Sequence, residues 1–232
     1  MTSPEQFIDI RSKYNEIVRC IDAGTLNQVA VAQALQNIID SKWTPPSWWR
    51  TPEQQLERAE QLWPHLVLPQ PPKRFLPQSK HEVPLLHVRS SFRVLWSKVE
   101  PPAGYSKVMG NYVDCDVQSL RTTPGKIEFT EAVWLGFDPQ RNKDEVPEDL
   151  WSDSDLAGPE VLSALIQFPD WPLSWTSDNP APFVSGYQAQ RMGKWECVPY
   201  LTIFKNHKEL KLNFTFADED GDHRPSPVVR VL

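Results

Sequence analysis

This sequence contains few cysteines, few glycines and no long apolar run. Its three cysteines, Cys20, Cys115 and Cys197, lie far apart and form no Cys-x-x-Cys spacing. Such a set excludes a disulfide framework and a cysteine-rich zinc site, and it is typical of reduced thiols. No stretch approaches the roughly 18 consecutive apolar residues of a membrane helix, and the N-terminal residues lack a secretory pattern. We therefore expect a cytoplasmic protein without a membrane segment.

Motifs that depend on glycine are missing as well. The chain has nine glycines, and none of them builds a phosphate-cradling loop or flanks a serine nucleophile. Rossmann, P-loop and serine-hydrolase chemistry are therefore set aside, and we expect no cofactor. The net charge of -6 disfavours a general role on nucleic acid, because that affinity rests on clustered lysine and arginine.

Proline and tryptophan are the residues that the sequence uses heavily. Proline accounts for 23 of the 232 residues, about twice its usual share, so the regular elements must be short. Six prolines fall between residues 64 and 84, a spacing that excludes a helix and favours an extended chain. We expect a proline-rich connector over 64–77 and a domain boundary near residue 78.

Before the connector, apolar residues recur at every third or fourth position. This spacing predicts two amphipathic helices, over 4–22 and 26–41, that form a hairpin. A third helix is predicted from residue 52 to about residue 63, since Thr51 can cap it and Pro52 fits its first position. Residues 1–63 are therefore expected to be a helical unit.

After the connector, the pattern changes to that of an α+β domain over 78–232. VPLLHV (83–88) is typical of a buried strand, and its His87 is expected to be a buried, hydrogen-bonded imidazole. If His87 met a carboxylate, a general-base role would become testable. SFRVLWSKV (91–99) and GPEVLSALIQF (158–168) have the spacing of helices.

The residues after position 182 indicate antiparallel strands. The stretch ELKLNFTFA (209–217) alternates most regularly, which predicts one buried face and one solvated face. The predicted fold class is α+β: an N-terminal helical hairpin plus a third helix, a proline-rich connector, and a mostly antiparallel sheet with two packed helices.

Two blocks, FTEAVWLGFDP (129–139) and EVLSALIQFPDWPLSW (160–175), resemble stretches of a bacterial protein family. The resemblance extends from about residue 50 to the C-terminus. The family comprises hypothetical cytoplasmic proteins of bacteria with reduced genomes, and no activity is known for it. The resemblance implies a cytoplasmic bacterial protein and assigns no catalytic residue.

Five tryptophans are candidate binding residues: Trp48, Trp49, Trp171, Trp175 and Trp195. Tryptophan supplies a large, stiff contact surface, and neighbouring prolines preorganise it. The alternative is that these rings close the core around turns of the chain. For Trp171 and Trp175 in FPDWPLSWTSDNPAP (168–182) we favour the packed core, whereas the adjacent Trp48 and Trp49 cannot both point inward from a helix.

Four carboxylates are the metal candidates: Asp114, Asp116, Glu128 and Glu131. The two aspartates share one face if their segment is a strand, and the two glutamates fall on what reads as a neighbouring strand. Carboxylates that converge from two strands would hold a magnesium ion for phosphoester hydrolysis. No lysine or histidine stands at a recognisable spacing from them, and a solvated sheet face is the simpler interpretation.

The leading hypothesis is a non-catalytic protein-interaction or assembly module, in which residues 1–45 dock on a protein partner or on a second copy. It rests on the hairpin being too short to bury its own apolar stripes. One alternative is a metal-dependent hydrolase or nuclease that uses the clustered carboxylates. The other is an aromatic groove that binds a peptide, a glycan or a single-stranded nucleic acid.

Overall fold

The structure is a computed structural model, and it describes residues 45–73, 75–110, 115–177, 179–218 and 224–232 together with 18–20, 24 and 27. For residues 115–119 it describes the backbone alone. The chain divides into two compact units, Met1–Thr44 and Pro45–Leu232. In the first unit residues 18–20 are helical, and the rest of the predicted hairpin lies outside the described residues.

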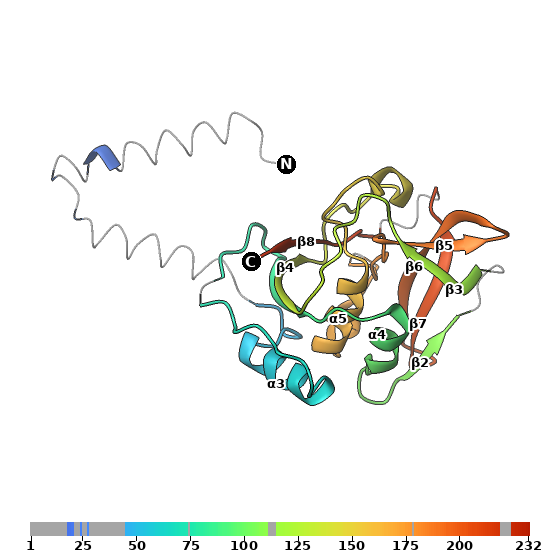
Figure 1. The fold of residues 1–232 in the computed structure, drawn as a ribbon, viewed down its shortest axis with the longest axis horizontal. Coiled ribbons are helices and arrows are strands. Elements are labelled where there is room, and N and C mark those ends of the chain that lie inside the picture. The colour runs from blue at the N-terminus through green and yellow to red at the C-terminus, as the bar shows by residue number, and fades with distance from the viewer. Residues whose placement is uncertain are drawn as a thin grey trace. The chain divides into compact units, whose positions relative to one another are not determined.

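The second unit has an α+β fold, as the sequence predicted (Figure 1). Its helices are α3 (Pro52–Leu62), α4 (Phe92–Lys98) and α5 (Pro159–Gln167), with the 3-10 turns η1 (Pro147–Leu150) and η2 (Trp171–Ser174). Its strands are β1 (Val83–His87), β2 (Ser106–Met109), β3 (Cys115–Thr122), β4 (Val133–Asp138), β5 (Tyr187–Arg191), β6 (Lys194–Phe204), β7 (Glu209–Phe216) and β8 (Val228–Val231). Within the described ranges, no helix is both long and apolar enough to span a bilayer.

The described strands form two sheets, whereas the sequence predicted one. A three-stranded sheet has the order β1-β4-β8, and a five-stranded sheet has the order β2-β7-β6-β5-β3. The described pairs are antiparallel except for the parallel pair of β2 and β7. β1 and β4 are buried along almost their whole length, so both of their faces are covered. These strands form a sheet separate from the C-terminal one.

Helix α5 lies near the centre of the unit, between the labels of the two sheets in Figure 1. It packs on β1 and α4, and its residues from Glu160 to Gln167 are all buried. On β7, Leu210, Leu212 and Phe214 are fully buried, as the predicted alternation requires, but Asn213 on the opposite face is buried as well and Phe216 is half-buried. The central helix therefore brings its own polar residues into a region with little water.

Helix α3 belongs to this unit and covers the edge of β1. The buried Gln55 side chain donates to the Pro84 carbonyl at 2.9 Å and accepts from the Leu86 N–H at 2.9 Å. It therefore satisfies two backbone groups that a neighbouring strand would otherwise pair. The structure consequently divides the chain after Thr44, ahead of the boundary expected near residue 78. The helical periodicity of α3 gave no sign of this polar contact with β1.

The proline-rich connector contains no helix or strand in its described residues. It nevertheless packs against the three-stranded sheet. The Trp134 indole N–H donates to the Pro69 carbonyl at 3.1 Å. Leu68 packs against the cluster that contains Leu86 and Trp134. Past the connector, Glu82 accepts from Arg230 Nε at 2.6 Å. The prolines thus keep the segment irregular without separating two domains.

Three helices have their final carbonyl groups bound by a basic side chain from another element. The pairs are Arg58 with the Ile166 carbonyl (2.5 Å), Lys98 with the Leu62 carbonyl (2.7 Å) and Lys107 with the Val99 carbonyl (2.7 Å). A cation at this end of a helix satisfies unpaired carbonyls and complements the helix dipole. Burial lowers the pKa of Lys107, and the nearby Glu100 acts in the opposite direction.

We expect Gln55→Leu to lower the free energy of unfolding by about 2–4 kcal/mol, because it leaves a buried N–H and a buried carbonyl of β1 unpaired. Glu60→Leu, at an exposed position of the same helix, is the control and should change it by less than about 0.5 kcal/mol. Urea denaturation measures both. Equal stability of the two variants would show that the amide does not replace a strand partner.

Candidate functional site

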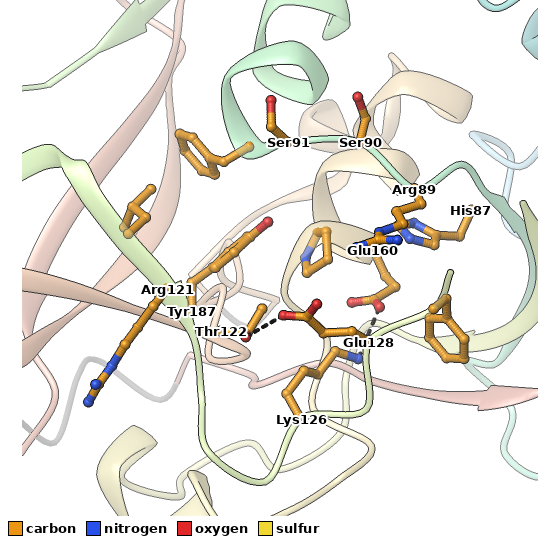
Figure 2. Close-up of a pocket in the computed structure, with 14 residues that line it drawn as sticks. His87, Arg89, Ser90, Ser91, Arg121, Thr122, Lys126, Glu128, Glu160 and Tyr187 are labelled. Carbon is orange, nitrogen blue, oxygen red and sulfur yellow. Dashed lines mark hydrogen bonds and ion pairs between the residues drawn. The ribbon is translucent and has the colours of Figure 1, made fainter. Parts of the chain in front are cut away.

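A cleft of about 580 Å³ opens among β1, β3, β5 and the first turn of α5 (Figure 2). One wall is the connection from β1 to α4. The opposite wall is the irregular segment 123–132, which lies between β3 and β4. Because four elements and a loop contribute, the lining residues come from widely separated parts of the sequence.

The floor of the cleft contains a buried ion pair. Lys126 Nζ lies 3.0 Å from Glu160 Oε1, and each side chain is 1% exposed. The second carboxylate oxygen of Glu160 accepts the Gly158 N–H at 2.8 Å. Figure 2 shows the pair linking the loop segment to α5. Charges taken out of water are stabilised when they are paired and hydrogen-bonded. Here the charges are paired and the Gly158 N–H satisfies one oxygen of Glu160, while Lys126 Nζ makes no hydrogen bond with a described residue.

Two glycines position the pair and the neighbouring tyrosine. A Cβ on Gly186 would lie 2.6 Å from the Gly158 backbone nitrogen, so the two backbones meet without side chains between them. The Gly186 N–H donates to the Ala157 carbonyl at 3.0 Å. This contact joins the start of β5 to the start of α5. Tyr187 and Glu160 consequently line the same cleft.

His87 is a buried, hydrogen-bonded imidazole, as the sequence predicted. It is 1% exposed, and its Nδ1 lies 2.9 Å from Ser163 Oγ on α5. Burial lowers the pKa of His87; the charge of Glu160 opposes this shift and that of Lys126 adds to it. The edge of the ring faces Phe129, with centroids 5.9 Å apart. The geometry therefore keeps a neutral ring beside the ion pair.

Tyr187 is a protonated hydroxyl on the cleft wall. Burial raises the pKa of Tyr187, and the negative charges of Glu160 and Glu128 raise it further. Its ring packs edge-on against Phe92, with centroids 5.6 Å apart. Its hydroxyl end and the Glu128 carboxylate face the same space in Figure 2. A phenol held in this form donates a hydrogen bond and does not act as a base.

The rim carries one cation and one anion. Glu128 Oε1 accepts from Thr122 Oγ1 at 2.7 Å. Arg89 is exposed and makes no hydrogen bond or ion pair with any described residue. Arg121 contributes to the lining, but its guanidinium stacks on Trp195 at 4.2 Å and donates to Gln188 at 2.8 Å. Arg89 and Glu128 are therefore the charged groups at the rim that face the cleft.

The structure does not place the four predicted metal-binding carboxylates on two adjacent strands. Asp114 lies outside the described residues, and of Asp116 the backbone on β3 is described. Glu128 and Glu131 are exposed in the irregular segment before β4, and β4 pairs with β1 and β8. Among the residues that the structure describes, no group of three or more histidine, cysteine, aspartate or glutamate side chains could hold a metal ion.

The tryptophans of the FPDWPLSW stretch lie in the core. Trp171 is 1% exposed and Trp175 is 3% exposed, and their rings meet edge to face at 5.3 Å. Trp48 packs on Trp171 at 5.8 Å and is half-buried. Trp49 and Trp195 are also half-buried. Trp171 and Trp175 therefore form a packed lid, and the candidate cleft is lined by other residues.

Sequence reasoning singled out His87 but missed Lys126, Glu160 and Tyr187. One signal was present: Glu160, Ser163 and Gln167 interrupt the apolar α5 at helical spacing, so they share a side. A polar stripe on a helix buried all round indicates a polar network. Nothing in the sequence near Lys126 indicated its partner.

We expect His87 to make the protein less stable in mild acid. Its pKa is lower in the folded state, so the unfolded chain binds the proton first and the free energy of unfolding falls as the pH drops below about 6.5. Below that pH, the contribution of His87 to the free energy of unfolding falls by up to about 1.4 kcal/mol for each further pH unit. In His87→Gln the slope between pH 7 and pH 5 should be shallower, while the exposed control His65→Gln should keep the parent slope. Urea titrations at several pH values measure this, and identical slopes in both variants would contradict it.

Comparison with models of known protein families, with curated proteins and with solved structures gave no match to this chain. The resemblance of 129–139 and 160–175 to a bacterial family therefore stays a prediction, and the cleft itself is the basis for function.

Proposed function

We propose that this protein is a non-catalytic binding protein, and that the cleft among β1, β3, β5 and α5 is its recognition site for a small polar ligand. The observation that carries the proposal is the buried pair of Lys126 and Glu160 beneath an open cleft whose rim has donors that bind none of the described residues. A cleft of about 580 Å³ lies in the range of small-molecule sites.

The ion pair supports a binding role for the cleft, because a buried ion pair usually adds little to the stability of a fold. Well-packed apolar residues in place of a buried ion pair are often neutral or stabilising, while loss of one partner costs about 3–5 kcal/mol. Lys126 and Glu160 border the cleft, although each side chain is only 1% exposed. Their position favours a fixed polar layer directly under the ligand.

The state of the titratable groups favours recognition over proton transfer. Lys126 and Glu160 bind each other, His87 is bound to Ser163, and the raised pKa of Tyr187 keeps its proton in place. A general acid or base needs a group that changes protonation state near the working pH. The groups here present fixed donors and acceptors, which suits binding.

We propose in addition that residues 1–45 are an assembly device, as the sequence suggested. The supporting observation is the amphipathic pattern of 4–22 and 26–41, whose apolar stripes need a partner surface. The partner is another protein or a second copy of the chain.

Blocking the cleft should abolish ligand binding without unfolding the protein. Ser90 lines the cleft and has no hydrogen-bond partner among the described residues, so Ser90→Trp places a large ring in the opening. The control Ser97→Trp puts the same ring on an exposed turn of α4 away from the cleft. Ligand-observed NMR with a panel of small polar metabolites measures binding. Ligands that bind the parent and the S97W variant should not bind S90W, and equal binding to S90W would contradict the proposal.

Residues 1–45 should be needed for self-association. We expect light scattering after gel filtration to give an oligomer for the full chain and a monomer for Pro45–Leu232, which forms a compact unit of its own. In the full chain, Ile17→Asp on the apolar stripe should give a monomer, whereas Asn15→Asp off the stripe should not. If the full chain is a monomer, self-association is ruled out and the partner is a different protein. If Pro45–Leu232 alone is an oligomer, residues 1–45 are not the assembly device.

A further inference from the structure

We infer that the ligand of this cleft is a small zwitterion, an α-amino acid with an apolar side chain, bound at its carboxylate by Arg89 and at its ammonium group by Glu128. The inference rests on the proposed binding role of the cleft and specifies the ligand. It is carried by the arrangement of charge and of apolar surface around the opening.

The cleft separates opposite charges: its lining holds the cations Arg89, Arg121 and Lys126 and the anions Glu128 and Glu160. On the floor, Lys126 and Glu160 neutralise each other at 3.0 Å. At the rim, Arg89 follows β1 and Glu128 lies in the loop before β4, so one cation and one anion approach from different walls. Arg121, which is also in the lining, directs its guanidinium to Trp195 and Gln188. The ligand that satisfies both remaining groups has one negative and one positive charge.

A ligand with a single charge fits this cleft less well. An anion on Arg89 would also meet the field of Glu128 and leave that carboxylate unpaired. A simple cation on Glu128 would leave Arg89 unpaired in the same way. Each unpaired charge loses hydration when a ligand fills the cleft, and that loss is compensated only by an opposite charge.

Arg89 has the donors that a carboxylate needs. It makes no hydrogen bond or ion pair with any described residue, and the adjacent Ser90 hydroxyl is likewise without a partner in that part of the chain. A guanidinium binds a carboxylate through two parallel N–H donors, a geometry that favours a planar acid group.

Glu128 has an acceptor left for an ammonium group. Its Oε1 is taken by Thr122 Oγ1 at 2.7 Å, and Oε2 makes no hydrogen bond with the described residues. The Thr122 bond fixes the carboxylate, so less side-chain freedom is lost on binding. Tyr187 adds a hydroxyl oxygen that faces the same space (Figure 2). Together they offer two acceptors to a group that has three donors.

The remaining lining is apolar and receives the side chain of the ligand. Phe92, Leu120 and Phe129 also line the cleft. The volume of about 580 Å³ is enough for one amino acid with a large apolar side chain. This wall distinguishes an apolar amino acid from a highly charged one.

Three probes with one phenyl group test the assignment on the full-length protein: L-phenylalanine, 3-phenylpropanoate and 2-phenylethylamine. Isothermal titration calorimetry and NMR titration give the dissociation constants. We expect L-phenylalanine to bind at least about tenfold more tightly than either probe with a single charge, because each of these lacks one ion pair.

Two variants and two matched controls assign the two charged groups. Arg89→Gln should weaken L-phenylalanine and 3-phenylpropanoate by about tenfold and should bind 2-phenylethylamine at least as tightly as the parent does, because no unpaired cation remains beside it. Glu128→Gln should weaken L-phenylalanine and 2-phenylethylamine and should bind 3-phenylpropanoate at least as tightly as the parent does. Arg93→Gln on α4 and Glu131→Gln in the loop remove the same charges at exposed positions outside the cleft lining, and they should leave all three constants unchanged. Circular dichroism checks that each variant is folded.

The assignment is overturned if the three probes bind equally, if none binds, or if Arg93→Gln and Glu131→Gln act as strongly as the cleft variants. These results are separable from failure of the binding role itself. If polar metabolites bind the parent and are lost in Ser90→Trp while L-phenylalanine does not bind, the cleft is a binding site for another class of ligand. If no metabolite binds the parent protein and loses that binding in Ser90→Trp, both proposals fail.

Discussion

Lys126 and Glu160 meet at 3.0 Å beneath the cleft, and each side chain is 1% exposed. The contact joins an irregular loop to the central helix, so the position of the loop wall depends on it. Loss of either partner would leave a buried charge without compensation, at a cost of about 3–5 kcal/mol. The close approach of Gly158 and Gly186 brings the start of α5 and the start of β5 together. The pair and the two glycines therefore determine where Glu128 and Tyr187 are placed.

The loop wall is held by backbone contacts as well as by the ion pair. The Thr123 N–H donates to the Gly186 carbonyl at 3.1 Å, and the Gly125 N–H donates to the Trp151 carbonyl at 3.2 Å. A Cβ on Gly125 would lie 2.2 Å from the Ser152 carbonyl oxygen, so this approach needs glycine. A segment without strand partners is thus fixed from two sides. These contacts hold the wall of the candidate cleft in place.

The sequence predicted the elements whose signal is local. The strand with His87 and the helices over 92–98 and 159–167 follow from periodicity, and the structure has all three. The association of elements was not predicted, because it rests on contacts such as Gln55 with β1 or Lys126 with α5 between distant residues. The prolines over 64–77 correctly predicted a segment without helix or strand. The packing of Leu68 was not predictable, because the surface that it contacts is built from residues distant in the sequence.

The aromatic stretch is conspicuous in the sequence, whereas the residues of the cleft are not. Trp171 and Trp175 are conspicuous in composition, but a proline-rich chain has few long elements, and large rings close its core around turns. Glu160 is one acidic residue in a helix that is otherwise apolar, and its partner lies in a loop without periodicity. Burial has opposite consequences for the two kinds of side chain. A buried aromatic ring is stabilised by packing, whereas a buried carboxylate is stable only with a cation beside it. A single charged residue on a helix buried all round therefore indicates a site more strongly than a group of tryptophans.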